Sequence, residues 1–482
     1  RKTMFFPSIL MFQTFPCFGG CSKVFSFKRY LTIQSHAKCV SVIKGYRFCT
    51  TSSTDGDLTG SNSAKAMENT PAKSSSSKKT KRKQDPMEPA PPASSFPSWA
   101  FDKRDYFRFE LVHQSKLSRA RVGRIHTPHG VVNTPGFVSV ATNGALKAVD
   151  HRAGDAAGCE LMFCNTYHLL LQPGPETIAA MGGLHRFVNR DRPIITDSGG
   201  FQVFSLSHGS VHDELNMKSR AGRNNWANTV LKVREEGVDF RSYRDGRPVH
   251  LSPETSVLAQ KAYRSDIIIP LDELPPYHIT TEKLTHSVFL SHRWEARSLR
   301  EHLKDLREQA MYCVVHGGID LNLRKHSIEY LSSLPFDGFA IGGSLGKDKD
   351  ELIDLLRFLM PHVPVDKPNH LLGIADEESI RRAVPWGVDT FDSCYPTRVA
   401  RHGYLLTFDG VVRLRQGKYA TDARPVQEGC ECHTCRNYSR AFLHHLIKAS
   451  EPIGSTLMTI HNLHHMNAAM ARTRQAILDG HV

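Results

Sequence analysis

Three cysteines, Cys430, Cys432 and Cys435, stand within six residues near the carboxyl end of the chain. Thiolates at this spacing can bind one soft tetrahedral ion, and an imidazole from the following helix would complete a Cys3His zinc site. Four protein ligands leave no open position for water, so we expect a structural zinc rather than a catalytic one. Spacing alone leaves the fourth ligand open among His444, His445, His461, His464 and His465.

A second set of residues able to do chemistry stands where short apolar runs of the chain stop. A single aspartate in such a place is often only a helix cap. Three aspartates that converge indicate a site, because the loops after the strands of a barrel meet at one mouth. The members of this set are Asn165, Asp197, Asp272, His316, Gly343, Gly373 and Asp392.

The elements that must position these residues alternate from about residue 105 onward. Apolar runs are separated by amphipathic stretches such as 350–360 and 377–384, which indicates a parallel sheet buried on both faces. Eight such units predict an α/β fold of the closed (β/α)8 TIM barrel type. The eight runs are 131–141, 161–164, 193–196, 266–271, 311–315, 338–341, 370–372 and 388–391.

The first hundred residues have a different composition. Residues 1–50 contain eight Lys or Arg and no Asp or Glu, which is typical of an organellar transit peptide, with an over-extended gene model as the alternative. Residues 51–100 are rich in Ser, Pro and Lys, and we expect them to be disordered. We therefore divide the chain into a transit peptide and linker (1–104), a barrel (105–424) and a zinc-binding subdomain with closing helices (425–482). The leader predicts a mitochondrion or plastid, with the cytoplasm as the alternative.

The net charge of +14 also belongs mainly to this leader. Residues 1–104 contain 17 Lys+Arg and 6 Asp+Glu, whereas the rest contains 45 and 42. Bulk charge therefore does not mark the body as a nucleic-acid binder. The cysteines, eleven in number and scattered, favour a reducing compartment over a disulfide framework. No run reaches the roughly 20 apolar residues of a membrane-spanning helix.

Four motifs taken together resemble the tRNA-guanine transglycosylases, over roughly residues 105–482. The family fold is a TIM barrel with a zinc-bearing insertion near the carboxyl end, which agrees with the alternation described above. Thr459-Ile460-His461-Asn462 matches a family motif, so the resemblance selects His461 as the fourth zinc ligand. The four motifs are residues 165–169, residues 196–202, residues 391–398, and the cysteine cluster followed by Tyr438-Ser439-Arg440.

The resemblance implies exchange of guanine at wobble position 34 of tRNAs with a GUN anticodon for queuine or a related 7-deazaguanine. Such an exchange breaks and remakes one N-glycosidic bond, and two displacements through a covalent intermediate follow the logic of a retaining glycosidase. In this family Asp392 corresponds to the nucleophile and Asp197 to the general acid/base. Asn165 corresponds to a residue that orients the nucleophile.

The resemblance also implies a base pocket and an RNA contact. Asp272 would hold the Watson–Crick edge of the base, and Phe201 and Leu372 would stack on its two faces. His316 stands where family members usually have Gln, a residue that reads the base carbonyl, and a neutral imidazole can donate one hydrogen bond there. The remaining implied contacts are Ser198, Gln202 and the backbone of Gly343 to the base, and Arg398 and Arg401 to the anticodon.

Several alternatives stay open at this point. The incoming base could be queuine, its precursor or guanine, and the partner a second copy or a non-catalytic paralogue. The segment 208–228 is predicted to be an inserted loop near the mouth. A non-catalytic partner subunit is disfavoured because both Asp197 and Asp392 are present. A barrel glycoside hydrolase would explain paired carboxylates, but not the zinc cluster or the flat-base pocket.

Overall fold

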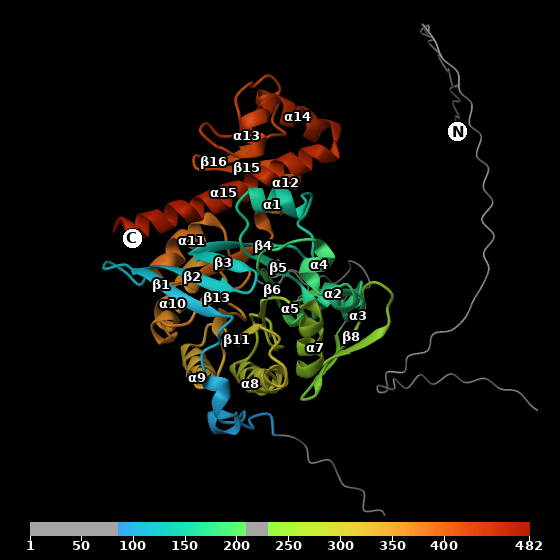
Figure 1. Cartoon of the computed structure of the whole chain (residues 1–482), viewed down its shortest axis with the longest axis vertical. Coiled ribbons are helices and arrows are strands. Elements are labelled where there is room, and N and C mark those ends of the chain that lie inside the picture. Colours follow the sequence, from blue (N-terminus) through green and yellow to red (C-terminus); the bar gives the residue numbers. More distant parts are fainter. Residues whose placement is uncertain (1–84, 209–229) are drawn as a thin grey trace, which may run out of the picture. The chain divides into compact units, whose positions relative to one another are not determined.

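The structure is a computed structural model that describes residues 85–208 and 230–482 (Figure 1). The predicted transit peptide and nearly all of the predicted insertion at 208–228 lie outside the described residues. The described chain begins with two short 3-10 helices, η1 (Ala93–Ser95) and η2 (Ser98–Phe101).

Eight parallel strands close into a barrel, with β14 pairing with β4 to complete the ring (Figure 1). The predicted (β/α)8 fold is therefore confirmed. Around the ring the strands are β4 (Gly136–Val140), β5 (Met162–Cys164), β6 (Ile194–Thr196), β10 (Ile267–Ile268), β11 (Ala310–Val315), β12 (Gly338–Ile341), β13 (Asn369–Leu371) and β14 (Thr390–Ser393).

Helices surround this barrel because each connection between parallel strands must cross back along its outside. Short 3-10 turns, η3 (Met360–His362) and η4 (Val384–Trp386), follow two of the helices. The helices are α1 (His151–Ala156), α2 (Thr166–Leu171), α3 (Pro175–Ala180), α4 (Leu184–Val188), α5 (Gly200–His208), α7 (Pro253–Tyr263), α8 (Thr281–Leu303), α9 (Leu321–Ser332), α10 (Lys349–Leu359), α11 (Glu377–Ala383) and α12 (Tyr395–Arg401).

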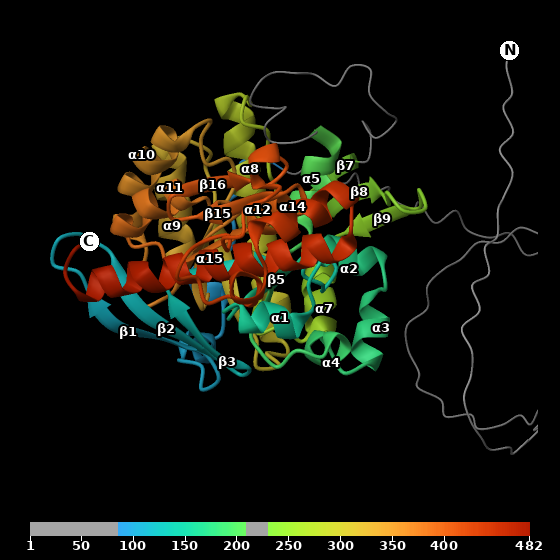
Figure 2. The ribbon, with the colours of Figure 1, turned by 90° about the horizontal axis from the view of Figure 1, so that it is seen from above.

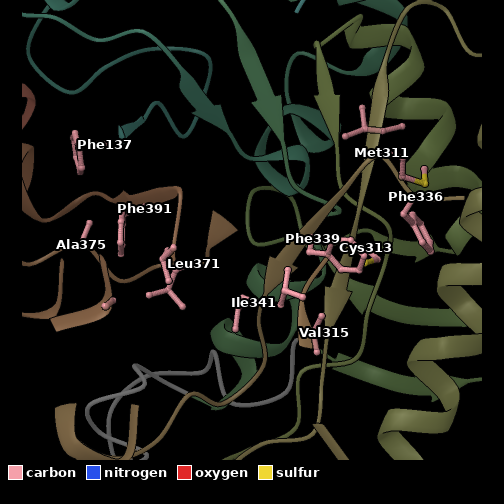
Figure 3. Packing of buried hydrophobic residues seen from close by; sticks show 14 of the residues in the cluster. Phe137, Met311, Cys313, Val315, Phe336, Phe339, Ile341, Leu371, Ala375 and Phe391 are labelled. Atoms are coloured by element: carbon pink, nitrogen blue, oxygen red, sulfur yellow. The ribbon is translucent and has the colours of Figure 1, made fainter. Parts of the chain in front are cut away.

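Burial on both faces explains why the barrel strands are continuously apolar. On β11, Met311 and Cys313 pack outward in the layer between strands and helices, whereas Tyr312 and Val314 fill the barrel interior. Figure 3 shows the outward layer, in which Phe339 of β12 belongs to the same cluster. Each such side chain contributes roughly 1.5–3 kcal/mol by leaving water.

Two of the predicted strands are much longer than the strands observed. The run 131–141 is split into β3 (Gly130–Thr134) and β4 on either side of Pro135, which has no N–H for a strand ladder. The run 266–271 pairs only over β10, because the side-chain amide of Gln260 bonds both the N–H and the C=O of Ile269. A side chain from α7 thus replaces a neighbouring strand at that point.

An antiparallel sheet of β1 (Arg108–Gln114), β2 (Arg121–Thr127) and β3 covers the amino-terminal end of the barrel. Ile125 and Val132 of this sheet pack into the interior cluster. The buried Arg121 joins the sheet to the barrel, since its guanidinium donates to both carboxylate oxygens of Asp389 at 2.9 and 2.6 Å.

The expectation of disorder over residues 51–100 is wrong for residues 85–100. Phe96 and Ala100 are buried against the barrel core. Backbone carbonyls of this Pro-rich segment accept hydrogen bonds from barrel helices, with Arg293 donating to Glu88 at 2.6 Å and Tyr330 donating to Pro91 at 2.9 Å. Composition could not reveal these partners, because they lie about 200 residues away in the sequence.

Two further groups of elements complete the described chain. An antiparallel sheet of β7 (Val230–Arg234), β8 (Gly237–Arg241) and β9 (Pro248–Leu251) packs beside α2 and α8. In the carboxyl-terminal region, α15 contacts both the last hairpin and strand β4, and it runs across the molecule in Figure 2. That region contains β15 (Tyr404–Thr407), β16 (Gly410–Arg413), η5 (Gly417–Tyr419), α13 (His433–Asn437), α14 (Arg440–Ala449) and α15 (Pro452–Leu478).

Among the described residues, none of the helices has the length and apolar character required to span a membrane.

Candidate active site and metal centre

Asp197 follows β6 directly and is held by a set of hydrogen-bond donors at the mouth of the barrel. Asn165 donates its side-chain amide to one carboxylate oxygen at 2.6 Å, and the backbone N–H of Thr166 donates to the other at 2.6 Å. The backbone N–H of Gly199 adds a bond of 3.2 Å, and the side chain of Gln202 bonds the same carboxylate. The carboxylate is thus fixed in position by two neighbouring strand-end loops.

Two glycines after Asp197 allow this arrangement. Gly199 has φ +86°, and a Cβ there would come within 3.0 Å of the backbone N of Tyr167. A Cβ on Gly200 would come within 2.9 Å of the backbone O of Asp272. Helix α5 can therefore begin between the neighbouring loops only if both positions lack a side chain.

Burial raises the pKa of Asp197 to about 6, although the hydrogen bonds from Asn165, Thr166, Gln202 and Gly199 act in the opposite direction. A carboxyl group with a pKa near neutrality can both accept and return a proton. This is the property expected of the general acid/base.

Asn165 does not occupy its predicted place beside the nucleophile. Its amide donates to Asp197, the other catalytic candidate. The reason lies in the ring order, because β5 pairs with β6 and delivers Asn165 next to the residue that follows β6. Strand β14, which carries Asp392, pairs instead with β13 and β4.

Asp392 lies near the end of β14, three strands away from β6 around the closed ring. One of its carboxylate oxygens accepts the backbone N–H of Gly373 at 2.7 Å and lies 3.1 Å from Nε2 of the buried His370. Asp392 and Asp197 are therefore both at the carboxyl rim but are held by separate sets of partners.

His370 is held in turn by a neighbouring hydroxyl. Its Nδ1 lies 2.9 Å from the hydroxyl oxygen of Thr390, and its Nε2 faces Asp392. A carboxylate can only accept hydrogen bonds, so Nε2–H of His370 is the donor when Asp392 is ionised.

Asp272 forms the third acidic position of the mouth. Burial, together with the nearby Asp197, raises its pKa to about 7. Ser198 donates its hydroxyl to Asp272 at 3.4 Å, and Nε2 of His316 lies 3.5 Å from the other oxygen of Asp272. Ser198, Asp272 and His316 are therefore brought together as predicted for a base pocket.

A cavity of about 320 Å³ adjoins this group of residues. His316 and Gly343 belong to its wall, and Gly343 lies close to Nδ1 of the His316 ring. The rest of the wall comes mainly from the loop after β10, the start of α8 and the loop after β11. It combines apolar residues such as Pro275 and Leu284 with polar residues such as Ser287 and Asp320.

The remaining predicted residues lie at the mouth or just beyond it. Phe201, in the first turn of α5, exposes 49% of its side chain, as a stacking surface must, and Leu372 is half-buried after β13. Arg398 and Arg401 are exposed on α12, which directly follows β14, the strand that carries Asp392. That Phe201 and Leu372 stack on the two faces of the base stays a prediction.

Two functional residues were missed by sequence reasoning. His370 was seen only as part of an apolar strand, and no spacing marks it as the partner of Asp392. Arg324 on α9 is fully buried, and its guanidinium donates to the carbonyls of Val315, Gly342 and Ser344 at 2.6 to 2.9 Å. It therefore holds together the two loops that carry His316 and Gly343.

The three cysteines and His461 gather into one cluster whose ligand atoms lie within 4.8 Å of one another. Nδ1 of His461 lies 3.9, 3.6 and 3.3 Å from the sulfurs of Cys430, Cys432 and Cys435. Tetrahedral coordination of Zn²⁺ with ordinary bond lengths separates nitrogen from sulfur by about 3.6 Å. The donor set and its dimensions therefore fit a metal ion of this kind.

The second ring nitrogen of His461 distinguishes it from the competing histidines. Nε2 donates to the backbone O of Leu406 at 2.8 Å, which leaves the lone pair of Nδ1 directed at the thiols. His444 bonds the carbonyl of Leu414, and His465 bonds Glu377. His445 is exposed, and His464 bonds Cys430 without joining the group of mutually close ligand atoms.

A (β/α)8 barrel with buried carboxylates at its mouth and a Cys3His cluster near its carboxyl end is the combination expected of the tRNA-guanine transglycosylases, the class of protein that the sequence resembles. The family model described as queuine tRNA-ribosyltransferase matches residues 115–482. This chain belongs to that family.

Curated relatives agree with the family match. A queuine tRNA-ribosyltransferase of Protochlamydia amoebophila (strain UWE25) is 58% identical over 372 residues, which are 77% of this chain and 95% of that protein. One from Chlamydia felis (strain Fe/C-56) is 52% identical over 377 residues, 78% of this chain and 99% of that protein. One from Chlamydia trachomatis serovar A is 49% identical over the same shares of both chains.

We predict that His370→Phe lowers kcat for base exchange by about 10- to 100-fold. The substitution removes a charge-assisted hydrogen bond worth about 1.5–3 kcal/mol, and each 1.36 kcal/mol corresponds to a factor of ten in rate. Steady-state kinetics with tRNA check this, and the exposed His402→Phe serves as the control that keeps the parent rate. A His370→Phe enzyme with the parent kcat would show that Gly373 alone suffices to orient Asp392.

Proposed function

We propose that this chain exchanges guanine at the wobble position of tRNAs with a GUN anticodon for queuine, through a covalent bond between Asp392 and C1′ of the ribose. The observation that carries the proposal is the different setting of two carboxylates on the same rim. Asp392 faces the imidazole of the buried His370, whereas burial leaves Asp197 with a pKa near neutrality. Two carboxyl groups in different environments take different roles in cleavage of a glycosidic bond.

In the first displacement, the carboxylate of Asp392 bonds C1′, and the C1′–N9 bond of guanosine breaks. Protonated Asp197 gives its proton to the leaving base. In the second displacement, Asp197 takes the proton from N9 of the incoming base, N9 bonds C1′, and the bond to Asp392 breaks. The configuration at C1′ is retained because it is inverted twice.

The target nucleotide must leave its stack to reach the mouth. Phe201 offers an exposed aromatic face for the flipped base, and Asp272 with Ser198 offers acceptors to its Watson–Crick edge. Arg398 and Arg401 on α12 are exposed beside the nucleophile strand, which suits cations that bind phosphates of the anticodon loop.

The cavity beside His316 and Gly343 supports queuine as the incoming base. A bare guanine needs no space beyond its ring, whereas queuine carries a bulky cyclopentenediol on an aminomethyl group. The cavity of about 320 Å³ has a wall of both apolar and polar residues and lies next to the residues assigned to the base. Neither a non-catalytic partner subunit nor a sugar hydrolase explains such a cavity beside a base-reading edge.

We further propose that the Cys3His cluster binds one structural zinc ion. When bound, zinc would cross-link residues 430–435 to α15 and take no part in the reaction. Next to His461, Asn462 accepts the N–H of Leu406 and donates to the carbonyls of Pro396 and Tyr404, each at 3.0 Å. The residue next to the zinc ligand His461 thus holds the start of α12, the helix that carries Arg398 and Arg401.

We predict that Asp392→Asn lowers incorporation of labelled queuine into tRNA by at least about 10³-fold, the scale seen when a nucleophile is removed. The parent should incorporate queuine in preference to its precursor and guanine, and should form a tRNA adduct that survives denaturing electrophoresis. The exposed Asp409→Asn is the matched control and should resemble the parent. Exchange by Asp392→Asn at the parent rate would mean that the chemistry is carried elsewhere.

The rate should also depend on pH in a defined direction. Asp197 must be a carboxylate to accept the N9 proton, so kcat/KM for the base should fall about tenfold per pH unit below about pH 6. Asp272 has a pKa of about 7 and accepts hydrogen bonds from the base as a carboxylate. The kcat/KM for the base should therefore continue to increase with pH up to about neutrality. A flat profile between pH 5 and pH 8 would remove Asp197 from this role.

Metal removal supplies a separate test of the cluster. Cys432→Ser should lower the zinc content from about one ion per chain to near zero and lower the temperature of thermal unfolding. His445→Ala, an exposed histidine on α14, should keep both at the parent level. Elemental analysis and differential scanning fluorimetry measure the two quantities, and unchanged zinc in Cys432→Ser would refute the assignment.

A further inference from the structure

Glu295 lies on α8 with its side chain completely buried behind β11. One of its oxygens, Oε2, accepts the backbone N–H of Val314 at 3.0 Å. Strand β10 has ended by this level, since its last pair joins Ile268 to Met311. The carboxyl group therefore occupies a place at the side of β11 where a strand partner is missing.

The second oxygen of Glu295 is directed toward the base pocket. Oε1 lies 3.5 Å from Nε2 of His316, and Nε2 lies equally far from Oδ2 of Asp272. In the described part of the chain, neither Oε1 of Glu295 nor Nε2 of His316 has a hydrogen-bond partner within bonding geometry. Two fully buried polar atoms at this distance need only a small adjustment to satisfy each other, and buried polar atoms are almost always paired.

Building on the proposed function, we propose that Glu295 is a positioning residue that donates a proton through Oε1–H to Nε2 of His316 and so makes Nδ1–H of His316 the donor to the carbonyl of the incoming base. The residue acts through His316 and does not itself touch the base.

The hydrogen-bond inventory supports this direction of donation. The N–H of Val314 donates to Oε2, so a proton on the carboxyl group belongs on Oε1. A neutral imidazole that accepts at Nε2 must carry its proton at Nδ1. Nδ1 is the ring nitrogen near Gly343, and Gly343 lines the same cavity as His316. A proton on Nδ1 would therefore be available to a base carbonyl held beside Gly343.

The electrostatics of the surroundings favour the neutral pair. Burial raises the pKa of Glu295 well above its usual range, and Asp272 raises it further. Burial, together with the charge of Arg324, lowers the pKa of His316 to about 3. A protonated carboxyl group next to a neutral imidazole is therefore the state expected near neutral pH.

The same geometry contains a competing arrangement. If ionised Asp272 accepted Nε2–H, the opposite tautomer would place a lone pair at Nδ1, and a lone pair repels a carbonyl oxygen. In the proposed function, Asp272 accepts hydrogen bonds from the N–H groups of the base. Glu295 is then the hydrogen-bond partner for Nε2 of His316. Four other titratable groups interact with the pair. Arg324 on α9 and His292 on α8, which bonds Ser327, act on His316 or are affected by it. Cys313 on β11 and Tyr330 on α9 lie near Glu295.

Two substitutions of Glu295 distinguish a hydrogen bond donated to His316 from a role in packing alone. In Glu295→Gln, the Val314 N–H requires the amide oxygen at the Oε2 position, so the amide N–H2 faces Nε2 of His316 and keeps the donor. Glu295→Met has similar length but no donor. We expect Glu295→Gln to keep the KM for the base within about threefold of the parent, and Glu295→Met to raise it about tenfold with the KM for tRNA unchanged.

A double-mutant cycle tests whether the effect passes through His316. In a His316→Ala background, Glu295→Met should raise the KM for the base no further, because the residue it positions is gone. A Glu295→Gln enzyme as impaired as Glu295→Met, a Glu295→Met enzyme with the parent KM, or fully additive effects would each overturn the proposal.

A measurement that does not depend on catalytic activity tests the proposal even if Glu295→Met fails to fold. Nitrogen-15 NMR of the histidine-labelled parent, with the His316 signals identified by their loss in His316→Gln, reports the tautomer directly. We expect the proton on Nδ1, and a proton on Nε2 would overturn the proposal. Absence of base exchange in the parent would instead count against the proposed function, while the tautomer would still test this inference.

Discussion

The pairing of β14 with β4 is the constraint on which the site depends, because it closes the barrel. In an open sheet, Asp392 on the last strand and Asp197 after β6 would stand along one edge. Closure bends that edge into a ring, so that the strand ends surround a single mouth. Helix α15 packs against β4, and the carboxyl-terminal region thereby supports this seam.

The mouth then gives each buried carboxyl group a different environment. Asp197 is surrounded by donors that keep it usable as a carboxylate despite burial, and Asp392 is paired with His370. Asp272 has fewer donors, and its pKa rises to about 7. Three aspartates of the same chemical type thus have different hydrogen-bond partners, which is how one fold supplies both a nucleophile and a general acid/base.

Side chains from the outer helices hold the strands and loops of the site in place by hydrogen bonds to their backbone. Gln260 of α7 bonds Ile269 where β10 loses its strand partner, and Glu295 of α8 bonds Val314 on the next strand. Arg324 of α9 ties the loops of His316 and Gly343 through backbone carbonyls. None of these residues was marked by its sequence context, because an isolated polar residue in a helix has many ordinary explanations.

The sequence by itself determined the barrel, the cysteine cluster and the identity of most residues at the mouth. Apolar runs with polar ends, and the spacing of Cys430 to Cys435, are patterns of neighbouring residues and can be recognised in the sequence alone. Only the tertiary structure decided that Asn165 serves Asp197, that His370 serves Asp392, and that residues 85–100 are packed. Those contacts join elements far apart in the sequence, and strand order around a closed ring sets them rather than any spacing along the chain.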